Sequence, residues 1–535
     1  MNSIISTVGG NEFLFYGLYL LSFFYVGFLV FVGSLIFYRL VLSPLAKFPG
    51  PRLAAATRLY ETYFQIIKGG TFTWHIDRLH EQYGPVVRIT PWEIHIKDPD
   101  YYGTIYAGPG KHRNKDPWFS FISFPESIFS TNGHELHRAR RRILGQFFKK
   151  NAIQEFEPVI RENVESLCAH FLGAAECNRS LELHAAFYSF TCDTISQYAF
   201  GRHSGFRYLK EPLLLATWKI RLTSIFEFSR VTRHFPVVSH IAHLFPTIAS
   251  WLAPQFGHVY RMEQDVKHQV ENVLHQHRRL DVKSNSKFHF MQNQSSIITS
   301  RAIYPTILAD KEVPQSEKSL KRLQDDAIFL MIAGTDAPSQ ALAITIFHIL
   351  NNPKVCEKLK YELFSRKPDI KSPATIAELE KLPYLSSVIR EGLRISSVVT
   401  TRLPRSAPDE ILQYHQWQIP AGTYVSMSTY FILRDPKIFP DPTNFEPERW
   451  LLPREKLREL ERYLVPASKG TLGCLGQNMA SAWMYLVIGT LFRRFNLSLH
   501  DTTERNVEMT RDNFIGQTDR GMNVVQVKVL EKYSH

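Results

Sequence analysis

The feature that most constrains this chain is an uncharged apolar run from Phe13 to Tyr38. Such a run is long enough to cross the ~30 Å hydrocarbon core of a bilayer as a helix. A cleaved signal peptide is the alternative, but its apolar region would be shorter and would follow a basic start, whereas residues 1–11 contain no lysine or arginine. We therefore expect four segments: a short tail, a transmembrane anchor, a basic and proline-rich hinge and a folded body, over 1–12, 13–38, 39–51 and 52–535.

Basic residues stand on only one side of this run. Arg39, Lys47 and Arg52 follow it and none precedes it, so the positive-inside rule places the tail in a lumen and the body in the cytosol. The five cysteines are an odd number at irregular spacing, unlike a secreted disulfide framework. We expect a single-pass protein of the endoplasmic reticulum membrane with its body in the cytosol.

The chain of 535 residues carries a formal net charge of +13. An excess of this size can serve nucleic-acid binding, but no zinc-finger spacing, RNA-binding signature or sustained basic tract accompanies it. A basic face toward anionic lipid or toward an acidic protein partner fits better. We therefore expect membrane lipid, and no nucleic acid, among the partners.

Periodicity predicts a mainly α body with a small β region. From the hinge to about Arg278 the pattern is mostly helical. Two short alternating segments, 86–89 and 94–96, resemble a hairpin within it. The polar stretch 281–317 indicates a loop region.

A long buried helix is predicted over residues 320–350. Apolar residues recur there at helical spacing, and only Gly334 and Pro338 interrupt them. Downstream, the pattern indicates a second helix, a strand and an irregular proline-rich segment, over 383–394, 424–428 and 435–453.

One cysteine, Cys474, stands in a glycine-rich loop directly before an apolar helical run: Ser468-Lys469-Gly470-Thr471-Leu472-Gly473-Cys474-Leu475-Gly476. A thiolate in such a loop can accept backbone N–H hydrogen bonds and lie close to a flat cofactor. A lone cysteine is more often a small buried hydrophobe. The motifs that precede the loop decide between these two interpretations.

An ionic network is predicted upstream of the cysteine loop. Glu391 and Arg394 are three residues apart and share one helix face, although such a pair alone is usually a surface ion pair of little energetic value. Arg449 lies on the irregular segment, and its fork-shaped guanidinium suits a shared buried carboxylate. We predict that these three residues lock the segment that leads to the cysteine loop.

The long buried helix carries an acid at its centre, in Ala333-Gly334-Thr335-Asp336. A carboxylate on an apolar helix costs free energy unless it is paired, hydrated or functional. Beside it, the small residue Gly334 would let a cofactor and a bound gas approach the helix.

In their order along the chain, these motifs resemble those of the cytochrome P-450 superfamily. The proline hinge, the acid-bearing helix, the Glu-x-x-Arg helix, the Pro-Glu-Arg-Trp segment and the cysteine loop occur in the family's order. The resemblance implies a cytochrome P-450 fold after one transmembrane helix, with 52–535 as the haem-thiolate catalytic domain. It also implies haem b as cofactor and Cys474 as the axial ligand of its iron. A thiolate ligand favours cleavage of the O–O bond of O2 and oxygen insertion into unactivated C–H bonds.

The resemblance further implies two partners in the reaction. O2 is one, and the two electrons must come from another protein, in this membrane setting an NADPH-cytochrome reductase. The basic segment 137–142, together with Lys149 and Lys150, is a candidate docking face for it. A solvated helix face explains the outward-pointing residues equally well.

Several residues are candidates for contact with the haem. His137 and Arg141 are four residues apart, so both can face inward, at places where the family often has a tryptophan or histidine and an arginine that bind a haem carboxylate. Arg405 is a third candidate for a haem carboxylate. The expected cofactor-binding set is completed by the cysteine and three glycines: Cys474, Gly334, Gly470 and Gly476.

The resemblance also bears on the substrate. The segment Trp118–Phe124 falls where the family's loop over the haem lines the pocket, which predicts an apolar small molecule; packing beneath a loop is the alternative. Residues 38–47 and 432–436 are similar to those of filamentous-fungal enzymes of terpenoid and other secondary-metabolite pathways. We therefore expect a terpenoid or another secondary metabolite.

Three positions depart from the family's pattern. Ala337 stands where a threonine usually helps deliver protons to bound dioxygen, Ala467 where a phenylalanine shields the thiolate, and Leu472 where an arginine pairs with a haem carboxylate. Monooxygenase is the first interpretation. The departures leave open an isomerase, a dehydratase or a peroxide-dependent enzyme of the same fold, and a haem-poor scaffold.

Without a hydroxyl at position 337, protons need another route. Pro338 has no N–H and its ring crowds the carbonyl of Gly334, so the helix is expected to open there and leave that carbonyl to a water or a ligand. Asp336 could then pass protons through that water, with Ser339 as a hydroxyl on the next turn. The alternatives are that Ser339 caps a backbone group and that Asp336 pairs with a basic neighbour.

Overall fold

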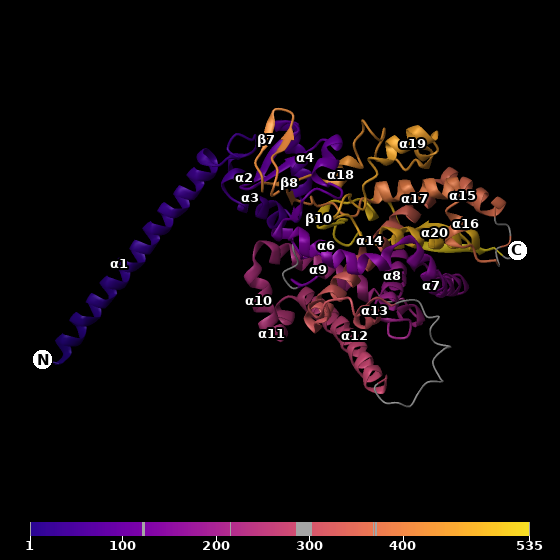
Figure 1. Cartoon of the computed structure of the whole chain (residues 1–535), viewed down its shortest axis with the longest axis horizontal. Coiled ribbons are helices and arrows are strands. Elements are labelled where there is room, and N and C mark those ends of the chain that lie inside the picture. Colours follow the sequence, from indigo (N-terminus) through magenta and orange to yellow (C-terminus); the bar gives the residue numbers. More distant parts are fainter. Residues whose placement is uncertain are drawn as a thin grey trace.

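The computed structural model describes residues 2–119, 124–214, 216–284, 302–366, 369 and 372–533. Helices dominate this part of the chain, and the predicted mainly α fold is confirmed (Figure 1). The α-helices are α1 (Asn2–Phe37), α2 (Arg52–Ala56), α3 (Leu59–Thr62), α4 (Phe72–Tyr83), α5 (Tyr102–Ile105), α6 (His134–Gly145), α7 (Lys150–Glu176), α8 (Leu183–Phe200), α9 (Thr217–His234), α10 (Pro236–Leu244), α11 (Pro246–Leu252), α12 (Pro254–Ser284), α13 (Ile303–Ala309), α14 (Leu320–Asn351), α15 (Pro353–Arg366), α16 (Ile376–Leu379), α17 (Pro383–Ser396), α18 (Thr429–Ile432), α19 (Arg454–Glu461) and α20 (Gln477–Arg494).

The strands are short and form small sheets. One sheet has the order β1-β2-β8-β5-β3 and a second the order β4-β12-β9, while β6–β7 and β10–β11 pair separately. The predicted hairpin is confirmed, because β1 pairs antiparallel with β2 and places Val87 opposite His95. The strands are β1 (Val86–Thr90), β2 (Glu93–Ile96), β3 (Asn114–Lys115), β4 (Leu181–Glu182), β5 (Arg405–Ser406), β6 (Leu412–Tyr414), β7 (Trp417–Ile419), β8 (Tyr424–Ser426), β9 (Phe495–His500), β10 (Arg511–Asn513), β11 (Ile515–Gln517) and β12 (Gln526–Lys532).

Helix α1 extends away from the body as an isolated rod (Figure 1). It begins at Asn2, before the apolar run, and a π-helical turn continues it over Tyr38–Leu42. The stretch Tyr16–Leu42 has a mean hydropathy of 2.4, and none of its most apolar window is buried. It is therefore a candidate membrane span. Helix α14 also passes this test, but most of it is buried within the body, as is typical of a core helix.

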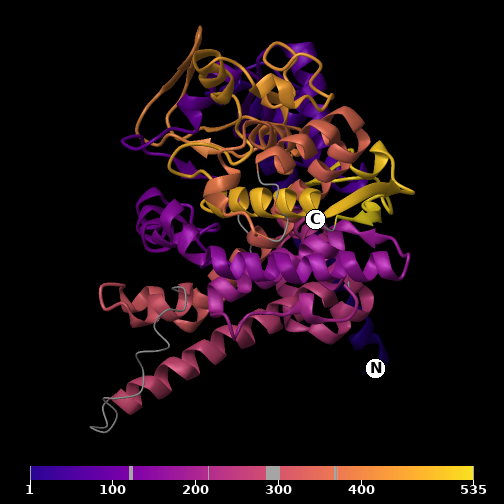
Figure 2. The same ribbon diagram turned by 90° about the vertical axis from the view of Figure 1, so that its right-hand side faces the viewer.

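Helix α14 confirms the predicted long buried helix, and it packs against α8, α12 and α17. In Figure 2, α20 crosses the middle of the body, and it packs against α7. The predicted opening at Pro338 is wrong for the secondary structure, since α14 continues without a break through Gly334 and Pro338. Pro338 cannot donate a backbone hydrogen bond, but this bond is one of many in α14. Tight packing against neighbouring helices holds the turns on either side of it.

The loop predicted over 281–317 is partly wrong. Helix α12 continues to Ser284, and α13 lies within the predicted loop. Ile303, Tyr304 and Ile307 are buried on one side of α13, but its two turns are too short for a clear helical period. Residues 285–301 lie outside the described residues. The predicted helix and strand further on are present as α17 and β8.

Candidate active site

Cys474 lies at the end of its loop, just before α20. Its N–H donates to the carbonyl of Ala467 at 2.8 Å. Burial raises the pKa of its thiol, whereas a hydrogen bond from the N–H of Gly476 and the charge of Arg141 lower that pKa. The side chain of Cys474 is nevertheless exposed. A sulfur that is surrounded by protein and still accessible lines an internal space.

Gly470 sets the path of this loop. Its φ is +74°, and a Cβ there would lie 2.2 Å from the carbonyl oxygen of Ala107. The N–H of Thr471 donates to that same carbonyl at 3.1 Å. Only glycine tolerates both the left-handed backbone and so close an approach. At Gly476, by contrast, a Cβ would meet no described atom within 4 Å.

The predicted pair on α6 does face inward. His137 is buried, and Nη1 of Arg141 donates to the carbonyl of Gly473 at 2.7 Å, which ties α6 to the cysteine loop. Arg405 on β5 acts on the charge of His137 and pairs in register with Lys115 on β3. Sequence reasoning missed Lys115, because nothing in the sequence signals a pairing between two strands of two residues each.

These four side chains form a cluster of basic groups, which we call the cationic cluster: Lys115, His137, Arg141 and Arg405. His137 and Arg405 are buried, and Lys115 and Arg141 are half-buried. Burial, together with the charges of Lys115, Arg141 and Arg405, lowers the pKa of His137 to about 3. Burial and the neighbouring arginines likewise lower the pKa of Lys115 far below its usual value. Among the described residues, no carboxylate is one of the main charges that act on His137, Lys115 or Arg405.

The cationic cluster fits an anionic ligand that lies beside Cys474. A buried cation costs free energy unless an anion balances it. Lys115 donates to the carbonyls of Ile128 and Phe129, at 2.9 and 2.6 Å, but Nε of Arg405 is buried without a hydrogen-bond partner in the described chain. The two carboxylates of haem b would balance and hydrogen-bond this cluster while the iron takes the Cys474 sulfur. The residues present therefore fit that cofactor.

One face of α14 lines the same kind of internal space. Within this mostly buried helix Ala333 is exposed, and Phe329, Leu330 and Ala337 are half-buried. Their spacing of three and four residues places them on one face, which we call the open face of α14. Gly334 lies beside that face, but a Cβ there would come within 2.7 Å of Ile195 on α8.

Asp336 and Ser339 point toward α8. The hydroxyl of Tyr188 donates to Oδ1 of Asp336, and Nε2 of Gln340 donates to Oδ2 at 2.9 Å. Burial raises the pKa of Asp336 to about 7, although these two hydrogen bonds lower it. Ser339 donates to the carbonyl of Thr335 at 2.6 Å. Asp336 thus contacts a phenol and an amide instead of the basic neighbour considered from sequence, while Ser339 makes a local backbone contact and also lies 2.8 Å from the hydroxyl of a threonine on α8, Thr191.

The predicted ionic network is confirmed and larger than expected. Arg394 donates to both oxygens of Glu391, at 2.9 and 2.7 Å, and Arg449 donates to Oε1 at 3.1 Å. The indole N–H of Trp450 and the backbone N–H of Glu446 add bonds of 2.8 and 3.0 Å. Glu391 and Arg394 are fully buried. This network joins α17 to the irregular segment before the cysteine loop.

The segment predicted to lie over the pocket is described only in part. Phe119 and Phe124 are buried, and Phe124 belongs to the main hydrophobic core. Residues 120–123, Phe121 among them, lie outside the described residues.

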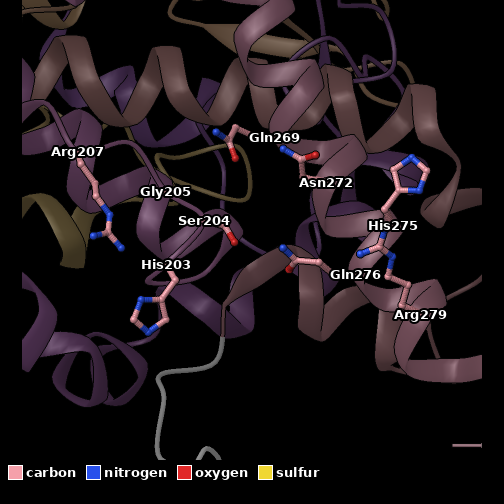
Figure 3. Close-up of a pocket in the computed structure, with 9 residues that line it drawn as sticks. All are labelled: His203, Ser204, Gly205, Arg207, Gln269, Asn272, His275, Gln276 and Arg279. Carbon is pink, nitrogen blue, oxygen red and sulfur yellow. The ribbon is translucent and has the colours of Figure 1, made fainter. Parts of the chain in front are cut away.

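A pocket of about 780 Å³ lies elsewhere, between α12 and the loop that follows α8. Figure 3 shows its lining, which is polar and includes no residue of the cysteine loop or of α14: His203, Ser204, Gly205, Arg207, Gln269, Asn272, His275, Gln276 and Arg279. This pocket is distinct from the candidate active site.

Comparison with known proteins agrees with this geometry. The family model for cytochrome P450 matches residues 51–523. Conidiogenone synthase of Penicillium rubens is 38% identical to the chain and aligns with 91% of it and with 94% of its own length. Cytochrome P450 monooxygenase MO6277 of Ascocoryne sarcoides is 36% identical, over 93% of this chain and 96% of its own. The accessible cysteine, the cationic cluster beside it and these matches agree, and the chain belongs to the cytochrome P450 family of haem-thiolate monooxygenases.

Proposed function

We propose that the body 52–535 inserts one oxygen atom of O2 into an apolar secondary metabolite, with Cys474 holding the haem iron and the cationic cluster holding the haem carboxylates. The observation that carries this proposal is the accessible sulfur of Cys474 beside the cationic cluster. When bound, the haem supplies the oxidising chemistry. Gly470 sets the path of the loop that carries Cys474, and Gly476, where a Cβ would meet no described atom, leaves room for the cofactor. Gly334 allows α14 to pack tightly on α8 while Ala333 faces the cofactor. A relative named conidiogenone synthase supports a biosynthetic role.

One spectrum tests this assignment. The ferrous–CO complex of the purified protein should show a thiolate-type Soret band. The absence of haem would instead favour the alternative left open by the sequence, a haem-poor scaffold protein. Consumption of NADPH that depends on both reductase and substrate, with an oxygenated product, separates a monooxygenase from an isomerase or a dehydratase. The departures at Ala337, Ala467 and Leu472 make this second measurement necessary.

We propose the exposed basic residues of α6 and the start of α7 as the docking face for an NADPH-cytochrome reductase. Arg138, Arg142 and Lys149 are exposed. A Cβ at Gly145 would lie 3.8 Å from Leu475, so the end of α6 lies next to the cysteine loop. Electrons that arrive at this face have a short path to the sulfur, and the positive charge attracts an acidic partner.

We also propose that the body touches the membrane a second time. Helices α10 and α11 carry a row of exposed apolar side chains, which we call the apolar patch: Phe235, Val237, Ile241, Leu244, Phe245, Ile248, Trp251 and Leu252. Figure 1 shows both helices on the side of the body from which α1 leaves. Lipid is the occupant that suits such a patch beside an anchor. With the tail 1–12 in the lumen, the body would rest on the cytosolic surface of the endoplasmic reticulum.

Loss of the apolar patch should weaken membrane binding. Burying a tryptophan and an isoleucine in lipid is worth ~1.5–3 kcal/mol each, so Ile248→Glu combined with Trp251→Glu should lower vesicle binding of a chain that lacks residues 1–42 by at least ~10-fold. Flotation with phosphatidylcholine and phosphatidylserine vesicles measures this. Tyr361→Glu, at an equally exposed site on α15, serves as the control. Equal flotation of all three proteins would rule out the apolar patch as a lipid contact.

We propose Asp336 as the proton donor, with Ser339 as a hydroxyl one turn on. Asp336→Asn should lower turnover by at least ~10²-fold, the scale of a positioned proton donor, while the haem spectra stay intact. Ala337→Thr should preserve or raise the fraction of electrons that end in product. Normal turnover of Asp336→Asn with reductase and O2 would exclude Asp336 as the proton donor.

Asp336→Asn, which should lower turnover, should at the same time raise the stability of the protein. The pKa of Asp336 is raised by burial from 3.8 to about 7, so wild-type stability falls as pH rises from about 4 to 7 and is constant above it. The neutral side-chain amide of the Asp336→Asn variant would resemble the protonated acid at every pH. The Tm of Asp336→Asn minus that of the wild type should therefore grow between pH 5 and pH 8, and a pH-independent difference would contradict the raised pKa.

A further inference from the structure

Arg233, on the last turn of α9, makes no hydrogen bond or ion pair with any described residue. Its guanidinium instead lies over two aromatic rings, 4.7 Å from the ring centre of Phe119 and 5.9 Å from that of Phe514. Contacts of this kind attract a cation to the ring faces. They hold the guanidinium in place and leave its five N–H donors to solvent or to a ligand.

A wall of aromatic rings connects the open face of α14 to Arg233. Phe329, one turn before Ala333 on that face, stacks on Phe129 with ring centres 4.5 Å apart. Phe129 meets the ring of Phe514 edge-on at 5.6 Å, and Phe514 contacts Arg233. An apolar wall of rings therefore runs from the open face of α14 to a cation.

Three acids act on Arg233, namely Asp512, Glu61 and Asp116. Each has another hydrogen-bond partner, although one oxygen of Glu61 and one of Asp116 has none. Asp512 and Glu61 are the acids that act most strongly on its charge, but neither lies within ion-pair distance of it in the described structure. Asp512 accepts hydrogen bonds from threonine hydroxyls, at 2.6 and 3.0 Å. Glu61 accepts one from Arg402 at 3.0 Å. Burial lowers the pKa of Arg233 to about 10, so it remains a cation at neutral pH.

We propose that Arg233 binds a carboxylate of the substrate, and that the substrate is therefore an apolar skeleton with one acidic end. The planar guanidinium matches a carboxylate with two parallel hydrogen bonds. The skeleton then lies along the aromatic wall, and its other end reaches the open face of α14. Arg233 thus determines which carbon faces the cofactor. The proposal rests on the proposed function, because the open face must be the site of oxidation.

Spectral titration of the full-length holoprotein with two probes tests this role. Dodecanoic acid and methyl dodecanoate share one flexible chain and differ in charge at one end. Arg233→Met should raise the Kd of the acid by at least ~10-fold, since a charged hydrogen bond is worth ~1.5–3 kcal/mol, and should leave the Kd of the ester within about threefold. Arg233→Lys should fall between. Each probe leaves the aqueous phase to the same extent whichever variant is present. The ratio of the Kd values of two variants therefore does not depend on this partitioning.

Arg221→Gln is the matched control. Arg221 lies on the same helix but pairs with Asp265 at 2.7 Å, so its loss should change neither Kd. Equal changes for acid and ester in Arg233→Met, no change for either, or no Soret shift of the wild type with the acid would each overturn the role of Arg233. The Soret band before titration tests the haem site separately. A wild-type protein without it would overturn the proposed function, and the assignment of Arg233 with it.

Discussion

Replacing Cys474 by alanine is expected to abolish the thiolate signature of the ferrous–CO complex and all oxygen insertion. Of the other cysteines, Cys168 and Cys192 are buried in α7 and α8, Cys356 lies on α15, and Cys177 is exposed at the end of α7. None stands in a loop beside the cationic cluster. The variant therefore has no second sulfur to offer the iron.

The haem that Cys474→Ala still binds measures how much the cationic cluster alone contributes to haem binding. The alanine removes the iron ligand but leaves Arg141 and Arg405 in place, so weak, spectrally altered haem binding should persist. Cys177→Ala, at an exposed site, should give wild-type spectra and turnover. A thiolate-type band retained in Cys474→Ala would refute the assignment of the iron ligand.

The parts of the site that could be predicted from sequence are those set by local spacing. Glu391 and Arg394 share a helix face because they are three residues apart, and His137 and Arg141 because they are four apart. Gly470 was expected to bind the cofactor, which stays a prediction; its positive φ and its closeness to the carbonyl of Ala107 explain why this loop position requires glycine. In each case a single helix or loop determines the relative positions of these residues, whichever elements pack against it.

The parts that were missed depend on which elements meet. Lys115 joins the cationic cluster because β3 pairs with β5, which lies far along the chain. Asp336 contacts Tyr188 because α8 packs on α14. That packing also explains why Gly334 lies against Ile195 and why Ala333 occupies the open face. Sequence identified the acid and the small residue but not the directions in which they point.

The second large effect is expected at Glu391, whose carboxylate accepts five hydrogen bonds in a fully buried position. Its partners come from two places: Arg394 on the same helix, and Arg449, Trp450 and the backbone of Glu446 on the irregular segment. Removing this carboxylate leaves the buried guanidinium of Arg394 with only carbonyl partners, those of Leu433, Pro442 and Asn444. The irregular segment then loses its attachment to α17.

Glu391→Ala should therefore destabilise the protein by ~3–5 kcal/mol, the cost of leaving buried charges unpaired, and yield little folded holoprotein. Glu391→Gln separates charge from volume: it keeps the shape, but its amide N–H groups would face N–H donors, so it should also lower Tm and haem content sharply.

Glu448→Ala is the matched control, because Glu448 lies nearby but is exposed and pairs with Lys358 at 2.6 Å, an interaction worth ~0–1 kcal/mol. Thermal unfolding and the ratio of haem to protein measure both outcomes. Normal Tm and haem content in Glu391→Ala would show that the irregular segment is held by packing alone, and a loss confined to Glu391→Ala, with Glu391→Gln intact, would mean that shape and not charge secures it.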